Sequence, residues 1–283
     1  MIRIVMLGRL GNNLFQYALG RVLAEKHGVP LVMDGSWFNG EGWAEVSHFL
    51  KLPIQAKVIR PCTLGARALR KFTGKHFWEF RGVPVLREAV EDQSFNPLFL
   101  DAPGDCMLFG YFQSPRYFDS MAPSLRAELN LLFANTVRVP EDLRARLMES
   151  GSVAVHVRRG DYLKHPAFHV CDSAYYQKSV EQMRARLPAA RFFVFSDEPE
   201  WCRSEFTGGD MEVIDSGNSA FNPLHDLHLM SLASHHIIAN SSYSWWAAWL
   251  GDKPSQEVIM PDRWYAHSVK APIEEKQWQV AWF

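Results

Sequence analysis

The sequence predicts an α/β protein built on parallel sheets, and three observations carry that prediction. Short apolar runs alternate with helix-like segments throughout the second half of the chain. Residues 2–34 show the same order of strand, glycine loop, helix and strand. Polar residues follow the apolar runs, which is typical of parallel strands whose carboxyl ends bind a ligand.

Composition limits the class of protein. The 283 residues are 47% hydrophobic and 22% charged, as expected for a globular chain with one large or two modest domains. Thirty basic residues balance thirty-one acidic ones, so no overall basic field favours nucleic acid or an anionic membrane. The four cysteines are widely spaced and contain no CxxC pair, which predicts reduced thiols and a cytoplasmic protein.

Two apolar stretches bear on the relation to membranes. The N-terminus, MIRIVMLGRLG, runs from a short apolar segment into a glycine loop, which is typical of a first strand rather than a signal peptide. Residues 227–251 lack Asp, Glu, Lys and Arg but include three histidines and five serines, which favours a protein core over a membrane span. We expect at most peripheral association with the inner face of the membrane.

The first unit begins with a predicted strand at 2–7, a glycine loop at 8–13 and a helix at 14–26. A second strand at 30–33 ends in Asp34. This superficially resembles a dinucleotide fold with an acidic ribose partner, although the glycines are spaced G-x-x-G and not G-x-G-x-x-G. A nucleotide-binding oxidoreductase is therefore an alternative class on this unit alone.

Residues 35–100 are predicted to be irregular and rich in aromatic side chains that could stack on a sugar ring, although buried aromatics more often form a core. The aromatics concerned are Trp37, Phe38, Trp43, Phe77, Trp78 and Phe80. Variable loops commonly carry specificity, so we expect contacts that decide ligand specificity in this region.

The second half alternates regularly between strands and helices. The predicted strands are 152–157, 191–195, 211–214, 235–239 and 257–260, and the predicted helices are 173–187, 198–206, 223–234 and 242–250. The strand ends are polar: His156 with Arg158 and Arg159, Ser196 with Asp197, Asp215 with Ser216, and Asn240 with Ser241 and Ser242. Each alone is more often a turn or a helix cap, but their convergence favours a binding site.

The run VAVHVRRGDY at 153–162 is the strongest candidate for anion binding. A buried strand leads directly into Arg158 and Arg159, and arginine donates hydrogen bonds in pairs that suit diphosphate oxygens. Gly160 permits a close approach of the backbone to a ligand. The alternative is a solvated turn in which an arginine pairs with Asp161.

Five blocks in this order resemble the α-1,2-fucosyltransferases of glycosyltransferase family 11, in their bacterial form. They are GRLGNNLFQYALG at 8–20, GYFQSPRYF at 110–118, HVRRGDY at 156–162, FSDE at 195–198 and DLHLMSLASHHIIANSSYSWWAAWLG at 226–251. HVRRGD recurs among α-1,2, α-1,6 and protein O-fucosyltransferases, whereas the first and last blocks indicate the α-1,2 branch. Two departures are Asn13, where the family usually has glutamine, and Ser234, near which it often has cysteine.

The resemblance implies a GT-B-like fold in which two Rossmann-like domains face a cleft. We expect an acceptor-side domain at 1–148, a GDP-fucose-binding domain at 149–265 and a tail at 266–283 that packs back on the first domain. The implied reaction is transfer of L-fucose with inversion from GDP-β-L-fucose to the 2-hydroxyl of a β-galactoside-terminated glycan. No cofactor or metal is implied, and the chain contains no D-x-D pair.

Roles follow for individual residues. By the resemblance Arg158 is the catalytic group that meets the β-phosphate. Attack by an acceptor hydroxyl needs a proton acceptor, for which Asp161 is the candidate, with an ion pair to an arginine as its alternative. The donor-binding set is His156, Arg158, Arg159, Gly160, Ser196, Asp197, Asn240, Ser241, Ser242 and Ser244. The acceptor-side set is Asn12, Gln16 and Tyr162, with helix capping for Asn12 and a surface position for Gln16 as alternatives.

Three other functions stay open at this point. One is a fucosyltransferase of another linkage, α-1,6 or O-fucosylation; the second is the oxidoreductase named above; the third is a catalytically inactive sugar-binding relative. The histidines at 225, 228, 235 and 236 are interpreted as structural, because no carboxylate or thiol completes a metal-ligand pattern around them.

Overall fold

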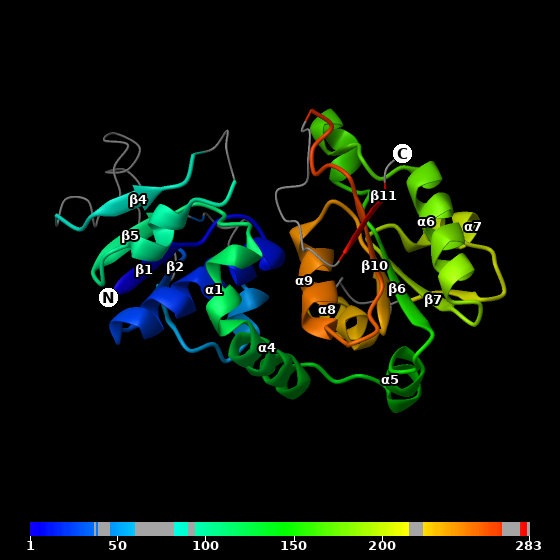
Figure 1. The fold of residues 1–283 in the computed structure, drawn as a ribbon, viewed down its shortest axis with the longest axis horizontal. Coiled ribbons are helices and arrows are strands. Elements are labelled where there is room, and N and C mark those ends of the chain that lie inside the picture. Colours follow the sequence, from blue (N-terminus) through cyan, green and yellow to red (C-terminus); the bar gives the residue numbers. More distant parts are fainter. Residues whose placement is uncertain are drawn as a thin grey trace. The chain divides into compact units, whose positions relative to one another are not determined.

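Two parallel sheets, one in each half of the chain, organise this computed structural model (Figure 1). The structure describes residues 1–36, 38, 46–59, 82–89, 94–214, 223–267 and 278–281. The chain divides into two units, Met1–Glu128 and Leu129–Phe283. The predicted α/β class with two parallel-sheet domains is confirmed.

The first unit contains a five-stranded sheet in the order β3-β2-β1-β5-β4. Its strands are β1 (Ile2–Val5), β2 (Leu31–Asp34), β3 (Lys57–Ile59), β4 (Val85–Arg87) and β5 (Cys106–Phe109). The helix α1 (Leu10–His27) connects β1 to β2 and ends at Gly28, whose φ of 61° caps its C-terminus. Short 3-10 turns lie at Phe49–Lys51, Pro97–Asp101, Pro115–Tyr117 and Asp119–Met121.

The second unit contains a six-stranded sheet in the order β11-β10-β9-β6-β7-β8. Its strands are β6 (Ser152–Val157), β7 (Arg191–Ser196), β8 (Met211–Val213), β9 (His235–Ile237), β10 (Val258–Pro261) and β11 (Gln279–Ala281). The helices are α4 (Ala122–Thr136), within which the unit boundary falls, α5 (Glu141–Leu147), α6 (Ser173–Arg186), α7 (Pro199–Glu205), α8 (Pro223–Leu232) and α9 (Ser242–Gly251). Two 3-10 turns, Tyr162–Lys164 and Pro166–Phe168, follow β6.

Strand β6 is buried on both faces, as a central strand of a covered parallel sheet should be. Val153 and Val155 pack into a core cluster with residues of α6 and α7, whereas Ala154 packs into a separate cluster with residues of α8 and α9. Figure 1 shows these two helix pairs on opposite sides of the sheet. Successive residues of β6 therefore face opposite layers: Val153 and Val155 face α6 and α7, and Ala154 faces α8 and α9.

The helix α1 begins four residues earlier than the sequence predicted. Gly8 has a φ of 66° and makes the turn after β1, and Arg9 is already the N-cap residue. Gly11, Asn12 and Asn13, which we assigned to a glycine loop, lie in the first turn of the helix.

Two further predictions differ from the structure. Residues 35–100 were expected to be irregular, but their described part contains β3 and β4, short edge strands with no clear alternation. The tail was expected to pack on the first domain, but β11 extends the second sheet parallel to β10, and Trp278 contacts Trp245 of α9 at 5.6 Å between ring centroids. The burial of Trp278 against α9 accounts for this placement.

Several smaller expectations have their outcomes here. Trp245, Trp246 and Trp249 of α9 are buried in the core. Within the described ranges, Cys106, Cys171 and Cys202 are free thiols, and Cys62 lies outside those ranges. Of the aromatics suggested to stack on a sugar, only Phe38 falls inside them. In the described part of the chain, no helix has both the length and the apolar character needed to cross a bilayer.

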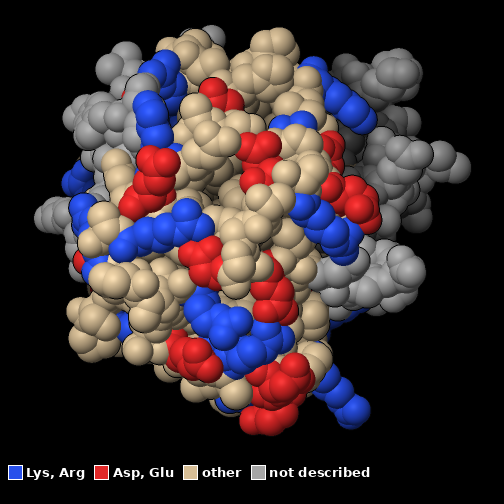
Figure 2. Space-filling view, turned by 90° about the vertical axis from the view of Figure 1, so that its right-hand side faces the viewer, with Lys and Arg blue, Asp and Glu red and all other residues tan. Residues whose placement is uncertain are grey.

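The face of the molecule in Figure 2 carries basic and acidic side chains close together. Its described charges form mixed groups and not a continuous basic field, which agrees with the balanced composition.

Candidate active site

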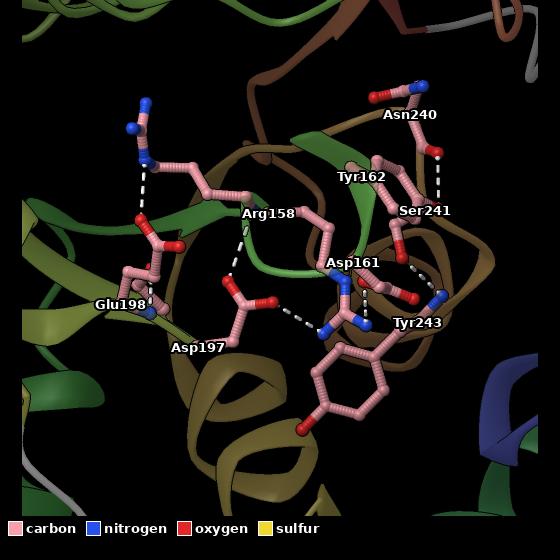
Figure 3. A network of polar contacts seen from close by, with 10 residues as sticks. Arg158, Asp161, Tyr162, Asp197, Glu198, Asn240, Ser241 and Tyr243 are labelled. Atoms are coloured by element: carbon pink, nitrogen blue, oxygen red, sulfur yellow. Dashed lines mark hydrogen bonds and ion pairs between the residues drawn. The ribbon is translucent and has the colours of Figure 1, made fainter. Parts of the chain in front are cut away.

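The strand order of the second sheet reverses beside β6. From β6 the chain proceeds outward through β7 and β8, then returns to form β9, β10 and β11 on the other side. Ligands of parallel α/β sheets bind outside the carboxyl ends of the strands at such a reversal. The predicted polar residues after β6, β7 and β9 meet there, as Figure 3 shows.

Arg158 is held by carboxylates from two different strand ends. Its Nη1 lies 3.0 Å from Oδ2 of Asp197, which follows β7, and its Nη2 donates to Oδ1 of Asp161 at 2.6 Å. The Tyr162 ring lies 5.4 Å from the guanidinium carbon. The side chain of Arg158 is 15% exposed, so the guanidinium is fixed in place and still reaches the surface.

Asp197 joins the two arginines of the motif. Besides the contact with Arg158, its Oδ1 accepts a hydrogen bond from the backbone N–H of Arg159 at 3.0 Å. A Cβ added to Gly160 would lie 2.7 Å from Oδ2 of Asp197. Any side chain at 160 would therefore force this carboxylate to shift, although the φ of Gly160 is not in the left-handed region.

Arg159 is directed away from Arg158 and lies between two side chains of the β7–α7 segment. Its Nε donates to Oε2 of Glu198 at 2.9 Å, and its guanidinium carbon lies 3.8 Å from the centre of the Trp201 ring. The sequence left open which arginine would pair with Asp161; in the structure Asp161 contacts Arg158, and Arg159 contacts Glu198. The backbone N–H of Glu198 in turn donates to Oγ of Ser196 at 2.9 Å.

The partners of Arg159 were missed by sequence reasoning. Glu198 stood in the quoted block FSDE without an assigned role, and Trp201 was not considered. Because the second sheet is parallel, the segment after β7 lies beside the segment after β6. A search for aromatic and acidic residues just after β7 would have found both.

His156, the second-last residue of strand β6, is buried and neutral. Burial, together with the charge of Arg158, lowers the pKa of His156 to about 3. Its ring lies 5.4 Å from the Tyr243 ring, and its Nδ1 has no hydrogen-bond partner among the described residues. At neutral pH this imidazole therefore contributes no positive charge to the strand edge.

The side chains of Asn240 and Ser241, which follow β9, bond to nearby backbone groups. Asn240 is buried, and its Nδ2 donates to the backbone oxygens of Trp264 at 2.9 Å and Phe168 at 3.3 Å. Ser241 caps α9, with its Oγ accepting from the N–H of Tyr243 at 3.4 Å. Their side chains thus bond to protein groups in this structure, although both were predicted to bind the donor.

Ser242 and Ser244 occupy different positions in the first turn of α9. The Ser244 hydroxyl is buried and donates to the backbone oxygen of Ser241 at 3.3 Å, whereas Ser242 is half-buried. Of these two predicted donor-binding serines, Ser242 is the one that reaches the surface. Asp215 and Ser216 lie outside the described residues.

Tyr162, which was predicted on the acceptor side, lies in the second unit with its ring 5.4 Å from the guanidinium carbon of Arg158. Its hydroxyl donates to the backbone oxygen of Asn240 at 3.2 Å, and its ring stacks on Phe168 with centroids 4.7 Å apart. Burial raises the pKa of Tyr162 to about 12, so the hydroxyl stays protonated.

Gln16, in the first unit, is fully buried, so the surface position considered for it is wrong. Its Nε2 donates to the backbone oxygen of Gly110 at 3.0 Å, and its Oε1 accepts from the N–H of Leu7 at 3.2 Å. Gln16 therefore ties the end of β1 to the end of β5. Asn12 is half-buried, and its Oδ1 accepts from Nε2 of Gln113 at 2.6 Å.

Asp34 and two of the histidines contact backbone groups of their own unit. Asp34 is buried and its Oδ1 accepts from the N–H of Ser36 at 2.9 Å, so it closes the turn after β2. His235 and His236 contact backbone oxygens at 2.8 and 2.9 Å. No cluster of three or more His, Cys, Asp or Glu suited to a metal ion occurs among the residues that the structure describes.

A parallel sheet with arginines at its strand reversal is typical of α/β proteins that bind nucleotides. The family model of glycosyl transferase family 11 matches residues 90–283 of this sequence. The chain belongs to that family, which confirms the resemblance found in the five sequence blocks.

Curated relatives agree with this membership. An α-1,2-colitosyltransferase of Escherichia coli is 28% identical over 274 residues, covering 91% of this chain and 90% of the relative. The O-antigen biosynthesis glycosyltransferase WbnK of Escherichia coli is also 28% identical, covering 96% and 97%. Galactoside 2-alpha-L-fucosyltransferase Sec1 of Mus musculus is 32% identical, covering 88% of this chain and 64% of that protein.

Two solved glycosyltransferase structures are similar to this chain at low sequence identity. The α-1,6-fucosyltransferase NodZ, soaked with GDP-fucose, is 16% identical with a TM-score of 0.47, covering 88% of this chain and 92% of that chain. The ADP-heptose heptosyltransferase II of Escherichia coli is 12% identical with a TM-score of 0.48, covering 99% and 89%.

Proposed function

We propose that this glycosyltransferase moves L-fucose from GDP-β-L-fucose to the 2-hydroxyl of a β-galactoside, with inversion and without a metal ion. The observation that carries the proposal is the fixed guanidinium of Arg158 at the strand reversal of the second sheet. Family membership and curated relatives named as α-1,2 glycosyltransferases support the reaction class.

The chemistry assigns a distinct task to Arg158. The acceptor oxygen attacks the anomeric carbon of fucose, the bond from that carbon to the β-phosphate oxygen breaks, and GDP leaves with the bonding electrons. Negative charge therefore grows on the leaving diphosphate, and a positioned guanidinium stabilises it without reorganisation. Nη1 and Nη2 of Arg158 each face a carboxylate with one N–H, and each has a second N–H that can donate to a phosphate oxygen.

Asp161 is proposed as the group that accepts the proton of the acceptor hydroxyl. Its side chain is 38% exposed, against 17% for Asp197, so it is the more accessible of the two carboxylates on Arg158. Replacing Asp161 with asparagine keeps one oxygen for the Arg158 contact and removes the base. A proton-accepting role predicts a much larger loss of kcat in D161N than a positioning role does.

The acceptor is proposed to contact Asn12 in the first unit, whose amide is half-buried at the start of α1. The experiment that tests the function is a GDP-release assay with GDP-fucose and a panel of β-galactosides, followed by linkage analysis of the product. An α-1,2 linkage supports the proposal, and an α-1,6 linkage rejects it. Full activity in EDTA is expected, and its loss on chelation would reject metal-free transfer.

A second donor has a specific observation in its favour. The colitosyltransferase relative is similar over nearly its whole length, so GDP-colitose is the alternative donor. Parallel assays with GDP-fucose and GDP-colitose on the same acceptor distinguish the two. A kcat/KM at least tenfold higher with GDP-fucose is expected, and the reverse ratio would assign the protein to colitosyl transfer.

A further inference from the structure

The backbone around Tyr111, just after β5, is held by side chains from the segments that follow the two neighbouring strands. Gln16, in the helix after β1, donates from Nε2 to the backbone oxygen of Gly110 at 3.0 Å. The carboxylate of Glu88, directly after β4, accepts from the backbone N–H of Tyr111 at 2.6 Å and of Phe112 at 3.0 Å. Because β1 and β4 flank β5 in the sheet, the ends of three strands meet at this segment.

The residues on either side of Tyr111 are adapted to this arrangement. A Cβ added to Gly110 would lie 2.5 Å from Cβ of Glu88, so glycine lets the carboxylate approach. Phe112 has a φ of 53° and is the one non-glycine residue with a positive φ in the described part of the chain. Its ring is fully buried and lies edge-on to Phe99 at 5.0 Å. Backbone strain that packing enforces in this way is concentrated at binding sites.

The side chain of Tyr111 takes no part in these contacts. It is partly exposed, whereas its neighbour Phe112 is fully buried. Within the described ranges its hydroxyl has no hydrogen-bond partner and its ring has no aromatic contact. Burial and the charge of Glu88 raise the pKa of Tyr111, so the hydroxyl stays protonated at neutral pH. The fold therefore fixes the backbone of a residue whose ring reaches the surface.

Tyr111 also lies at the strand reversal of the first sheet. In that sheet β2 and β3 lie on one side of β1, and β5 and β4 lie on the other. Ligands of parallel α/β sheets bind outside the carboxyl ends of the strands at such a reversal, and Tyr111 is the second residue after β5. A tyrosine combines an apolar ring with a polar hydroxyl, which suits a surface that binds a sugar.

We propose that Tyr111 binds the saccharide acceptor, with its ring stacked on the C–H face of the galactose that receives fucose. The inference rests on the proposed function and adds to it a residue that holds the reacting sugar. In a β-galactoside O4 is axial, so the C–H groups at C3, C4 and C5 form an apolar face on the side opposite O4. The 2-hydroxyl is equatorial and projects from the edge of the sugar ring, so a stacked tyrosine leaves it open to reaction.

The test separates the aromatic ring from apolar bulk at position 111, on the β-galactoside of the panel with the highest kcat/KM. Tyr111→Phe keeps the ring, and Tyr111→Leu keeps an apolar side chain without one. We expect Y111F to retain kcat/KM for this acceptor within about threefold and Y111L to lower it about tenfold, as the loss of one aromatic contact implies. KM for GDP-fucose should change less than about twofold in both variants, because the contact is made to the acceptor alone.

A matched control is Phe95→Leu, which removes another partly exposed ring of the first unit. The guanidinium carbon of Arg116 already lies 3.9 Å from the centre of that ring. Phe95→Leu should therefore leave kcat/KM for the acceptor at the wild-type level.

If Y111L fails to fold, saturation-transfer difference NMR on the wild-type protein with GDP and the galactoside carries the test. Saturation should be strongest at the hydrogens on C3, C4 and C5 of galactose, which face the proposed ring. Saturation strongest at other positions of galactose would overturn the inference.

The outcomes separate the two proposals. A wild-type enzyme that fucosylates galactosides, while Y111L and Y111F have equal kcat/KM for the acceptor, rejects the inference and leaves the proposed function standing. A wild-type protein that transfers no fucose to any galactoside rejects both.

Discussion

Arg158 and Asp197 form an ion pair at 3.0 Å across the ends of the neighbouring strands β6 and β7. The same carboxylate accepts a hydrogen bond from the backbone N–H of Arg159, and its Oδ2 would lie 2.7 Å from a Cβ added to Gly160. Asp197 thus sets the position of the guanidinium that we propose to stabilise the leaving diphosphate. The geometry of the arginine motif after β6 therefore depends on Asp197, which follows the adjacent strand β7.

Gly160→Ala should lower kcat about tenfold. The new Cβ would lie 2.7 Å from Oδ2 of Asp197, so the carboxylate must shift, and Arg158 with it. The measurement is steady-state turnover, with Gly209→Ala as control because a Cβ there meets nothing within 4 Å. Equal turnover in the two variants would show that the position of Asp197 does not matter.

Arg159→Met should affect activity much less than a change at Arg158. Methionine retains apolar contact with Trp201 and loses the partly exposed pair with Glu198, which contributes about 1 kcal/mol or less to the free energy of unfolding. We expect kcat within about threefold of wild type and a small fall in Tm. A loss of kcat as large as that of an Arg158 variant would assign Arg159 to the diphosphate as well.

Stability should decrease as pH falls from about 6.5 towards 4. Burial lowers the pKa of His156 and His236 to about 3 and that of His228 to about 4, so each binds a proton more readily in the unfolded chain. Each contributes up to about 1.4 kcal/mol per pH unit to the fall in unfolding free energy. A Tm that is constant or rises between pH 7 and pH 5 would contradict this.

The sequence was most informative where local pattern decides the structure. The apolar run at 152–157 became β6 with the predicted bounds, and the strand predicted at 191–195 became β7 with one residue added. Both are central strands buried on two faces, for which hydrophobicity alone is a sufficient signal. The convergence of polar residues at their ends followed from the parallel order.

What the sequence could not predict depends on contacts between distant segments. Two adjacent arginines could each pair with Asp161, Asp197 or Glu198. Which carboxylate each arginine contacts depends on the directions of side chains at two strand ends. The burial of Gln16 depends on Gly110, which follows β5. Likewise, α1 begins at Leu10 because Gly8 alone makes the turn, and the spacing of the glycines did not reveal this.

The most direct test of the central claim is the kcat of Arg158→Ala with GDP-fucose and a β-galactoside, on protein shown to be folded by its circular dichroism spectrum. Loss of a group that stabilises charge on the leaving diphosphate should lower kcat about a hundredfold or more. Turnover close to wild type in the folded variant would contradict the claim that Arg158 is the catalytic group.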